Sequence, residues 1–282
     1  MTCSLCDHTG WRPLEDNGVR RVVRCDCWRQ NAVAQAMRDA GIPPRYEAST
    51  LDNFQDYSDS LVTAVTKARA FTATFPVFDK GLLLLGAPGV GKTHLAVAIL
   101  KAVIQNTAAQ AQFSDTRELL RRIRDTYNPV VKTTEIQVIR PVMEAELLVL
   151  DDLGAERTTD WVDETLNLII NTRYNYRRAT IFTSNYPDRE PDEKAMVETL
   201  QERIGSRGYS RLNEMCDFIK MEGMDFREVG PNPTTEQLHA YLKSGPKKLP
   251  LRAGRQARAQ MREPSVRDGK ADLKWPGGRA GS

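Results

Sequence analysis

Short apolar segments alternate with amphipathic helical patterns from residue 81 to about residue 229. Apolar side chains recur three or four positions apart at Leu119, Leu120 and Ile123, and again at Val162, Leu166, Ile169 and Ile170. The predicted strands are residues 81–85, 111–114, 147–151, 180–184 and 215–221. Strands that are buried on both faces read as near-continuous apolar runs. The alternation therefore predicts an α/β fold with a five-stranded parallel sheet flanked by helices.

Three other segments differ in composition from this core, which we place at residues 81–229. Residues 1–30 contain closely spaced cysteines, and residues 31–80 read as a helical connector that is broken at Gly41-Ile42-Pro43-Pro44. From residue 230 to residue 282, prolines and glycines interrupt a basic sequence of low hydrophobicity. Such a composition buries too little apolar surface to fold, so we expect a largely disordered tail.

Charge is distributed unevenly along the 282 residues. The net charge is +3, but the 11 Lys/Arg and 4 Asp/Glu from Pro231 onward give +7, so the first 230 residues carry −4. A basic tail can attract DNA in a salt-dependent way, or it can solubilise or tether the protein. No apolar run is long enough to span a bilayer, and the N-terminus does not read as an export signal. We therefore expect a cytoplasmic protein with no membrane contact.

Residues 86–93 read Gly-Ala-Pro-Gly-Val-Gly-Lys-Thr, directly after the apolar run of the first predicted core strand. A glycine-rich turn between a strand and a helix forms a phosphate-binding loop, in which backbone amides surround the anion. Lys92 would reach the β- and γ-phosphates, and the Thr93 hydroxyl would bind Mg²⁺. The alternative is a glycine-rich turn without a ligand. The predicted nucleotide contacts are Gly86, Ala87, Pro88, Gly89, Val90, Gly91, Lys92, Thr93 and His94.

Two further predicted strands end in polar residues. The third strand ends at Asp151 and is followed by Asp152. Because ligands bind at the carboxyl ends of parallel strands, Asp151 is predicted to support Mg²⁺ and Asp152 to activate the attacking water. Asn185 follows the fourth strand and could hydrogen-bond the γ-phosphate or that water. The alternatives are an acidic turn after a buried strand and an asparagine that begins the turn before Pro187.

Arg203 and Arg207 lie four residues apart, so in a helix they would share a face. Arginines in this position can stabilise the charge of a transferring phosphoryl group across a subunit boundary. A solvated cationic helix face is the alternative.

The order of these motifs resembles that of AAA+ ATPases, and more closely that of DnaC/DnaI-type helicase loaders and the related IstB-type transposition ATPases. The resemblance covers about residues 1–228. The stretches that carry it are Gly41-Ile42-Pro43-Pro44-Arg45-Tyr46, Leu51-Asp52-Asn53-Phe54, Leu150-Asp151-Asp152-Leu153-Gly154, Thr183-Ser184-Asn185, and Gly205-Ser206-Arg207 followed by Met215-Cys216.

The resemblance implies a ring or spiral of subunits, in which Arg207, aided by Arg203, completes the neighbouring subunit's site. It also implies single-stranded DNA contacts on the helix after the second core strand, where this chain has Arg117, Arg121, Arg122, Arg124 and Tyr127. Two features depart from the family's pattern. A C-terminal helical lid is not evident, although Arg227 is a candidate for the sensor-2 arginine, and Asp152 stands where most AAA+ proteins have Glu. The shorter acid implies slow, gated hydrolysis.

The N-terminal cysteines form two close pairs, Cys3-x-x-Cys6 and Cys25-x-Cys27, separated by 18 residues. Folding the chain back between them would give four thiolates suited to tetrahedral Zn²⁺, with His8 as an alternative ligand. Unligated reduced thiols remain the other interpretation. The pattern resembles zinc modules that precede this ATPase core in some loaders and act as adaptors for the helicase or for DNA.

The favoured hypothesis is an ATP- and Mg²⁺-dependent DNA replication protein that loads a replicative helicase onto single-stranded DNA as a homo-oligomer. The alternatives are an IstB-like transposition ATPase that acts on duplex DNA, a nucleotide-sensing DNA-binding adaptor with little turnover, and, more weakly, a small-molecule kinase.

Overall fold

A computed structural model describes residues 3–7, 9–16, 19–130, 132–188 and 198–229 of the chain. The chain divides into two units, Met1–Lys248 and Leu249–Ser282, and the second lies entirely outside the described residues. The predicted basic tail at residues 230–282 and the candidate ligand His8 also lie outside them. Within the described residues, none of the helices combines the length and the apolar character needed to cross a bilayer.

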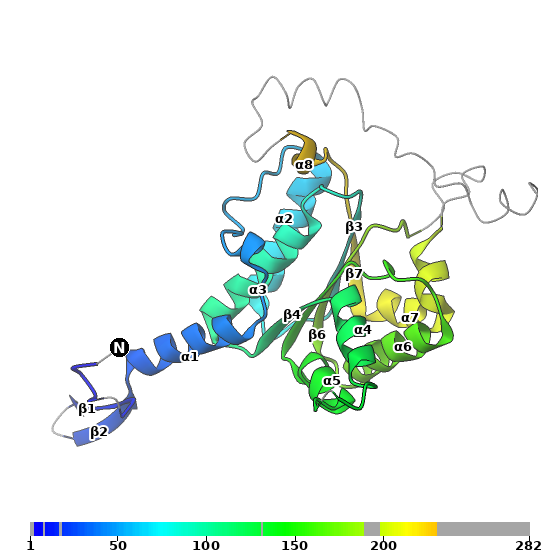
Figure 1. Ribbon diagram of the computed structural model, residues 1–282. Coiled ribbons are helices and arrows are strands. Elements are labelled where there is room, and N and C mark those ends of the chain that lie inside the picture. Colours follow the sequence, from blue (N-terminus) through cyan, green and yellow to red (C-terminus); the bar gives the residue numbers. More distant parts are fainter. Residues whose placement is uncertain (1–2, 8, 17–18, 131, 189–197, 230–282) are drawn as a thin grey trace, which may run out of the picture. The chain divides into compact units, whose positions relative to one another are not determined.

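The core is the predicted five-stranded parallel sheet (Figure 1). Its strands are β3 (Gly81–Gly86), β4 (Ala111–Asp115), β5 (Leu147–Asp151), β6 (Ala179–Ser184) and β7 (Cys216–Met221), in the order β4-β5-β6-β3-β7. Neighbouring strands pair in parallel throughout. All five carboxyl ends therefore meet at one edge of the sheet, and the phosphate loop and the paired acids lie at this edge.

Two apolar layers cover the sheet, one on each face, as Figure 1 shows for the helices. Alternate side chains of one strand enter different layers. Leu82 and Leu84 of β3 pack in the first layer, whereas Leu83 and Leu85 pack in the second. Every second side chain of a strand points to the same face, so continuous apolar runs are what a sheet buried on both sides requires.

The helices fall into two groups by the layer to which they contribute. The first layer includes side chains of α1 (Asp26–Asp39), α2 (Asp59–Thr74) and α3 (Lys92–Thr107). The second includes side chains of α4 (Thr116–Asp125), α5 (Glu135–Glu144), α6 (Asp160–Asn175) and α7 (Leu200–Met215). A short 3₁₀ helix, η1 (Pro44–Tyr46), follows the predicted break after α1, and α8 (Phe226–Val229) follows β7.

Three local features differ from the sequence-based expectation. Helix α5 was not predicted, because Pro141 lies within it. The fifth strand begins at Cys216, since Met215 is the last residue of α7. Helix α1 begins at Asp26, so the cysteine-rich segment ends inside a helix that continues into the connector.

The cysteine-rich segment contains a two-stranded antiparallel sheet of β1 (Trp11–Asp16) and β2 (Val19–Arg24). Trp11 pairs with Arg24 at the open end of this sheet. The Arg24 guanidinium lies 4.1 Å from the ring centroid of Trp11 and 4.4 Å from that of Trp28. The hairpin returns the chain, so that the two cysteine pairs meet.

Candidate functional site

The phosphate loop joins β3 to α3 at the carboxyl edge of the sheet. Gly91 precedes the helix with a φ of 101°, a conformation that side chains with a Cβ rarely adopt. The Lys92 ammonium is buried and donates hydrogen bonds to the carbonyls of Gly86 and Ala87, each at 2.8 Å. Burial lowers the pKa of Lys92 to about 8, while the charges of Asp152 and Asp151 act in the opposite direction. The loop thus holds a desolvated cation close to two carboxylates. This cation, together with the backbone amides of the loop, would stabilise a bound polyphosphate.

Asp151 connects the loop to two neighbouring strands. The Thr93 hydroxyl donates to both of its carboxylate oxygens, at 3.0 and 3.1 Å, and the Thr183 hydroxyl of β6 lies 2.6 Å from Oδ1. Burial raises the pKa of Asp151 to about 6, although the two hydroxyls oppose this shift. A buried carboxylate beside a threonine hydroxyl fits the oxygen ligands that Mg²⁺ prefers.

Asp152 and Asn185 lie together, as the sequence predicts for the ends of adjacent strands. The Asn185 amide donates to Asp152 Oδ1 at 3.0 Å, and the Asp152 backbone N–H donates to the Thr183 hydroxyl at 2.9 Å. Asp152 has a φ of 54°, which places its backbone in the left-handed region. The carboxylate is therefore fixed by its own backbone and by the strand beside it.

Asp115 is a further candidate for the site, beyond the residues predicted from the sequence. Carboxylate oxygens of Asp115, Asp151 and Asp152 lie within 4.8 Å of one another, which gives a group of acids with the geometry of a cation site. Asp115 ends β4 and also accepts a hydrogen bond from the Glu118 backbone N–H at 2.9 Å. Its position at a strand end could have indicated it, but the residue also reads as an ordinary helix N-cap.

Segments before and after the core strands contact the phosphate loop and α3. His94 Nε2 lies 3.0 Å from Asn53 Oδ1, and burial lowers the pKa of His94. His94, a predicted nucleotide contact, therefore also contacts the segment that precedes α2. On the C-terminal side, the Phe226 backbone N–H donates to the Gly89 carbonyl at 3.2 Å, and the charge of Arg227 contributes to the lowered pKa of Lys92. Arg227 thus lies within electrostatic range of the phosphate loop.

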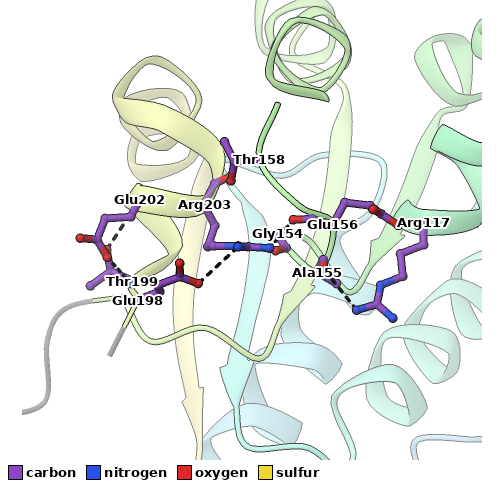
Figure 2. Close-up of polar contacts among 9 residues, drawn as sticks. All are labelled: Arg117, Gly154, Ala155, Glu156, Thr158, Glu198, Thr199, Glu202 and Arg203. Carbon is purple, nitrogen blue, oxygen red and sulfur yellow. Dashed lines mark hydrogen bonds and ion pairs between the residues drawn. The ribbon is translucent and has the colours of Figure 1, made fainter. Parts of the chain in front are cut away.

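The prediction that Arg203 and Arg207 share a helix face is wrong. Gly205 has φ 73° and ψ 158°, so a kink separates the two residues within α7. The Arg203 side chain is only 13% exposed and is held by the segment after Asp152, as Figure 2 shows. Arg207 is exposed and lines a surface cavity of about 640 Å³ that Asp160, Asp163 and Glu164 of α6 also line.

The candidate DNA-contacting arginines of α4 largely contact other parts of the protein. Arg117 donates to the Ala155 carbonyl at 3.1 Å, and Arg121 pairs with Glu118 and Asp125. The Arg124 guanidinium lies 4.9 Å from the Trp161 ring centroid. The sequence could not reveal the partners of Arg117 and Arg124, because these lie outside α4, whereas the pairs of Arg121 follow from its helical spacing to Glu118 and Asp125.

The four N-terminal cysteines come together, as predicted. Their sulfurs lie within 4.8 Å of one another, with 3.7 Å between Cys3 and Cys25 and 3.2 Å between Cys6 and Cys27. Four sulfurs bound tetrahedrally to Zn²⁺ lie roughly 3.8 Å apart, so the arrangement fits that ion. Contacts within the group shift the thiol pKa values in opposite directions: the Leu5 backbone N–H lowers the pKa of Cys3 to about 7, whereas the Cys6 sulfur raises the pKa of Cys27. Cys216 is buried in the core, away from this group.

A phosphate loop, the buried carboxylate of Asp151 beside the half-buried one of Asp152, and a strand-end amide on this sheet have the arrangement of a nucleotide-binding site. The family described as "IstB-like ATP binding protein" matches residues 24–228, which is most of the chain. The chain belongs to this family. The ligand expected at the phosphate loop of an IstB-like ATP-binding protein is accordingly ATP, usually with Mg²⁺.

Individual relatives have the same core. The chain is 26% identical over 208 residues to YqaM of Bacillus subtilis (strain 168), covering 70% of this chain and 62% of YqaM. It is 24% identical over 182 residues to the replicative helicase loader DnaC of Escherichia coli (strain K12), covering 64% of this chain and 71% of DnaC. A crystal structure of the DnaC helicase loader superimposes with a TM-score of 0.57 at 34% identity, covering 64% of this chain and all of that one. The IstB-like chain thus spans less than two thirds of YqaM.

Proposed function

We propose that this protein is an ATPase that loads a replicative helicase onto single-stranded DNA. The observation that supports it best is the connected set of Thr93, Asp151, Thr183, Asp152 and Asn185, joined by hydrogen bonds at the edge of the sheet. The similarity to DnaC, a replicative helicase loader, supports the pathway.

Each residue has a separate task in the proposed reaction. Lys92 leaves its loop carbonyls to bind the β- and γ-phosphates, and Thr93 and Asp151 would hold Mg²⁺, which neutralises phosphate charge when bound. Asp152 accepts the proton of the attacking water, and Asn185 orients both the acid and the water. Asp152 has a shorter reach than a glutamate, so we expect slow hydrolysis that depends on a partner.

The proposed assembly is a homo-oligomer in which Arg207 stabilises the transferring phosphoryl group of the neighbouring subunit. Its exposure and its separation from Arg203 by the Gly205 kink support this role. On α4 we assign DNA contact to the exposed Arg122, because Arg117, Arg121 and Arg124 have other contacts. Just beyond α4 we add the ring of Tyr127, which is 54% exposed although its hydroxyl accepts a hydrogen bond from Trp161 Nε1 at 3.1 Å. The cysteine module would bind Zn²⁺ and serve as an adaptor for either the helicase or DNA.

A pull-down from the host lysate tests the pathway, with ATP and with ADP in parallel. We expect the wild-type protein to recover a replicative helicase in a nucleotide-dependent manner. Lys92→Ala removes the ammonium group that would bind the phosphates, so it should abolish ATP binding and make helicase recovery independent of the nucleotide. Unchanged ATP affinity in Lys92→Ala would disprove the site, whereas intact ATP binding without any helicase would disprove only the pathway.

A transposition ATPase is the second candidate, because the matching family is the IstB-like one. The two candidates differ in the DNA they prefer. Predominant binding of duplex DNA, without helicase recovery, would favour the transposition role over helicase loading.

A further inference from the structure

The segment Leu153–Thr158, which follows Asp152, is held by arginines from two different helices (Figure 2). Arg203 of α7 donates from Nε to the Gly154 carbonyl at 2.8 Å and from a terminal nitrogen to the Glu156 carbonyl. Arg117 of α4 donates to the Ala155 carbonyl between them, at 3.1 Å. Three successive backbone carbonyls thus each accept a hydrogen bond from a guanidinium group.

Arg203 is itself fixed from several sides. Glu198 pairs with it at 3.2 Å, and its guanidinium lies 4.9 Å from the Tyr186 ring centroid. The Arg203 carbonyl accepts a hydrogen bond from the Thr158 hydroxyl at 3.5 Å, so the backbone of α7 also contacts the segment. The capping box of Thr199 and Glu202 begins the helix one turn earlier. A side chain in this position would have to break these contacts to reach another subunit.

Gly154 is the residue that allows the close approach. A Cβ added at Gly154 would lie 3.1 Å from the Arg203 Cβ, and the φ of Gly154 is +83°. Any larger residue would require the Arg203 stem to shift by a few tenths of an ångström and would strain the backbone, since its φ lies in the left-handed region. The glycine after the acid pair therefore serves the contact with α7.

The same segment fixes the backbone of Asp152. The Ala155 N–H donates to the Asp152 carbonyl at 3.1 Å, and the Leu153 N–H donates to the Thr183 carbonyl at 2.8 Å. Asp152 has a left-handed φ of 54°, which persists only where the surroundings enforce it. A displacement of Gly154 or Ala155 would thus reorient the Asp152 carboxylate relative to Asn185.

We propose that Arg203 is a positioning residue for Asp152 of its own subunit and does not contribute charge to the neighbouring site. The inference rests on the proposed ATPase function. Arg203 acts through the carbonyls of Gly154 and Glu156, whereas Arg207, beyond the kink, acts on the next subunit. Helix α7 then connects the water-activating acid of one site with the arginine that completes another.

Mixing experiments distinguish the two roles of an arginine. Lys92→Ala subunits have a dead nucleotide site but retain both arginines. Added to Arg207→Ala subunits, they should restore part of the hydrolysis, because the missing arginine is supplied from outside. Added to Arg203→Ala subunits, they should restore none, because the damaged site is the subunit's own. Rescue of Arg203→Ala would overturn the proposal.

Single-variant kinetics give a second readout. Arg203→Ala should lower kcat by about 10- to 100-fold, with the KM for ATP within about threefold of wild type, because a misplaced acid affects the chemical step more than binding. Arg203→Lys, which can still donate to one carbonyl, should recover part of the loss. The control is Arg157→Ala, which removes an exposed arginine from the same segment and should leave kcat unchanged. A loss of ATP affinity equal to the loss of kcat would contradict positioning.

Hydrogen exchange keeps the proposal testable if the protein does not hydrolyse ATP at all. The amides of residues 153–156 should exchange faster in Arg203→Ala than in wild type, and those of β3 should not change. Unchanged exchange at residues 153–156 would overturn the positioning role. Failure of the Arg207→Ala mixture alone would instead count against the shared site of the proposed function.

Discussion

At the scale of single residues, the site combines opposite charges that burial disfavours. The pKa of Lys92 is lowered to about 8 and that of Asp151 is raised to about 6, in both cases mainly by desolvation. Such groups cost stability in the folded protein, and bound phosphate and Mg²⁺ would supply ionic partners for them. Without ligand, the site thus lowers the free energy of unfolding, and a bound ligand would restore it.

Asp151→Asn should therefore stabilise the protein in the absence of Mg²⁺ and nucleotide. The folded pKa lies above the unfolded one, so the ionised carboxylate disfavours folding fully above about pH 6 and not at all below about pH 4. We expect the free energy of unfolding to rise by about 1–3 kcal/mol at pH 7.5, and the gain to vanish as the pH falls from 6 to 4. Urea unfolding in a chelating buffer measures it.

The matched control is Asp79→Asn, an exposed carboxylate between α2 and β3. It should change the free energy of unfolding by less than about 0.5 kcal/mol at either pH. A loss of stability in Asp151→Asn at pH 7.5 would show that the hydroxyl contacts of Thr93 and Thr183 outweigh the cost of burying the charge.

Where a candidate site residue follows the end of a strand, the sequence alone predicts its place in the fold. Asp151 and Asp152 stand at the end of one predicted strand and Asn185 follows another, while Lys92 and Thr93 come after the glycine-rich loop of a third. Parallel pairing of these neighbouring strands gathers all five residues at one edge. The sequence could not predict that Thr183 would contact both Asp151 and Asp152, since these contacts depend on the register of β5 against β6. It assigned Arg203 by its spacing from Arg207, and spacing gives no sign of a kink.

At the scale of elements, α5 is held at its C-terminal end by one buried arginine from α6. Arg173 is 0% exposed and donates to the carbonyls of Val142, Met143 and Ala145, at 2.8, 3.1 and 3.0 Å. It also reaches the Ala179 carbonyl of β6. Burial lowers the pKa of Arg173 to about 9. The guanidinium satisfies carbonyls that a helix end leaves without partners and thereby joins α5 to the sheet.

Arg173→Met should lower the free energy of unfolding by about 3–5 kcal/mol, because methionine fills the space but leaves several buried carbonyls without donors. Faster hydrogen exchange in α5 than in α3 would locate the loss. Arg140→Met, at an exposed position on α5 with a weak ion pair at 3.9 Å, should cost less than about 0.5 kcal/mol. A change below about 1 kcal/mol in Arg173→Met would mean that water replaces the guanidinium.

The sequence predicted helices where apolar spacing was regular, as in α3, α4 and α6, because packing on a sheet face imposes that spacing. It missed α5, in which Pro141 interrupts the local signal while Val138, Ile139 and Val142 still pack on the core. Tertiary packing, and not intrinsic helix preference, fixes that element.

At the scale of the whole molecule, the core and the cysteine module have different sources of stability. The core has two large apolar layers. The described part of the cysteine module contains a two-stranded sheet, and the side chains of Leu5, Trp11, Leu14 and Val22 in it are exposed. A two-stranded sheet is marginal alone, so a bound metal would supply the missing folding free energy.

Purified protein should accordingly contain about one zinc per chain, and a strong chelator should unfold the segment before α1 without changing the melting temperature of the core. Metal analysis and hydrogen exchange would measure the two effects. Cys6→Ser should lower the zinc content, whereas Cys216→Ala, which removes a buried core thiol, should not. Zinc-free protein with an ordered hairpin would exclude the metal role.

The hydrogen bonds of Lys92 to its own loop also bear on how a reaction cycle would end. In the proposed reaction, departure of ADP would not leave the ammonium without partners in a desolvated crevice, because the carbonyls of Gly86 and Ala87 lie 2.8 Å away and can replace the phosphate. The free energy cost of releasing the nucleotide is therefore smaller than if Lys92 lost its phosphate contacts without replacement. We expect spent nucleotide to dissociate without the help of an exchange factor.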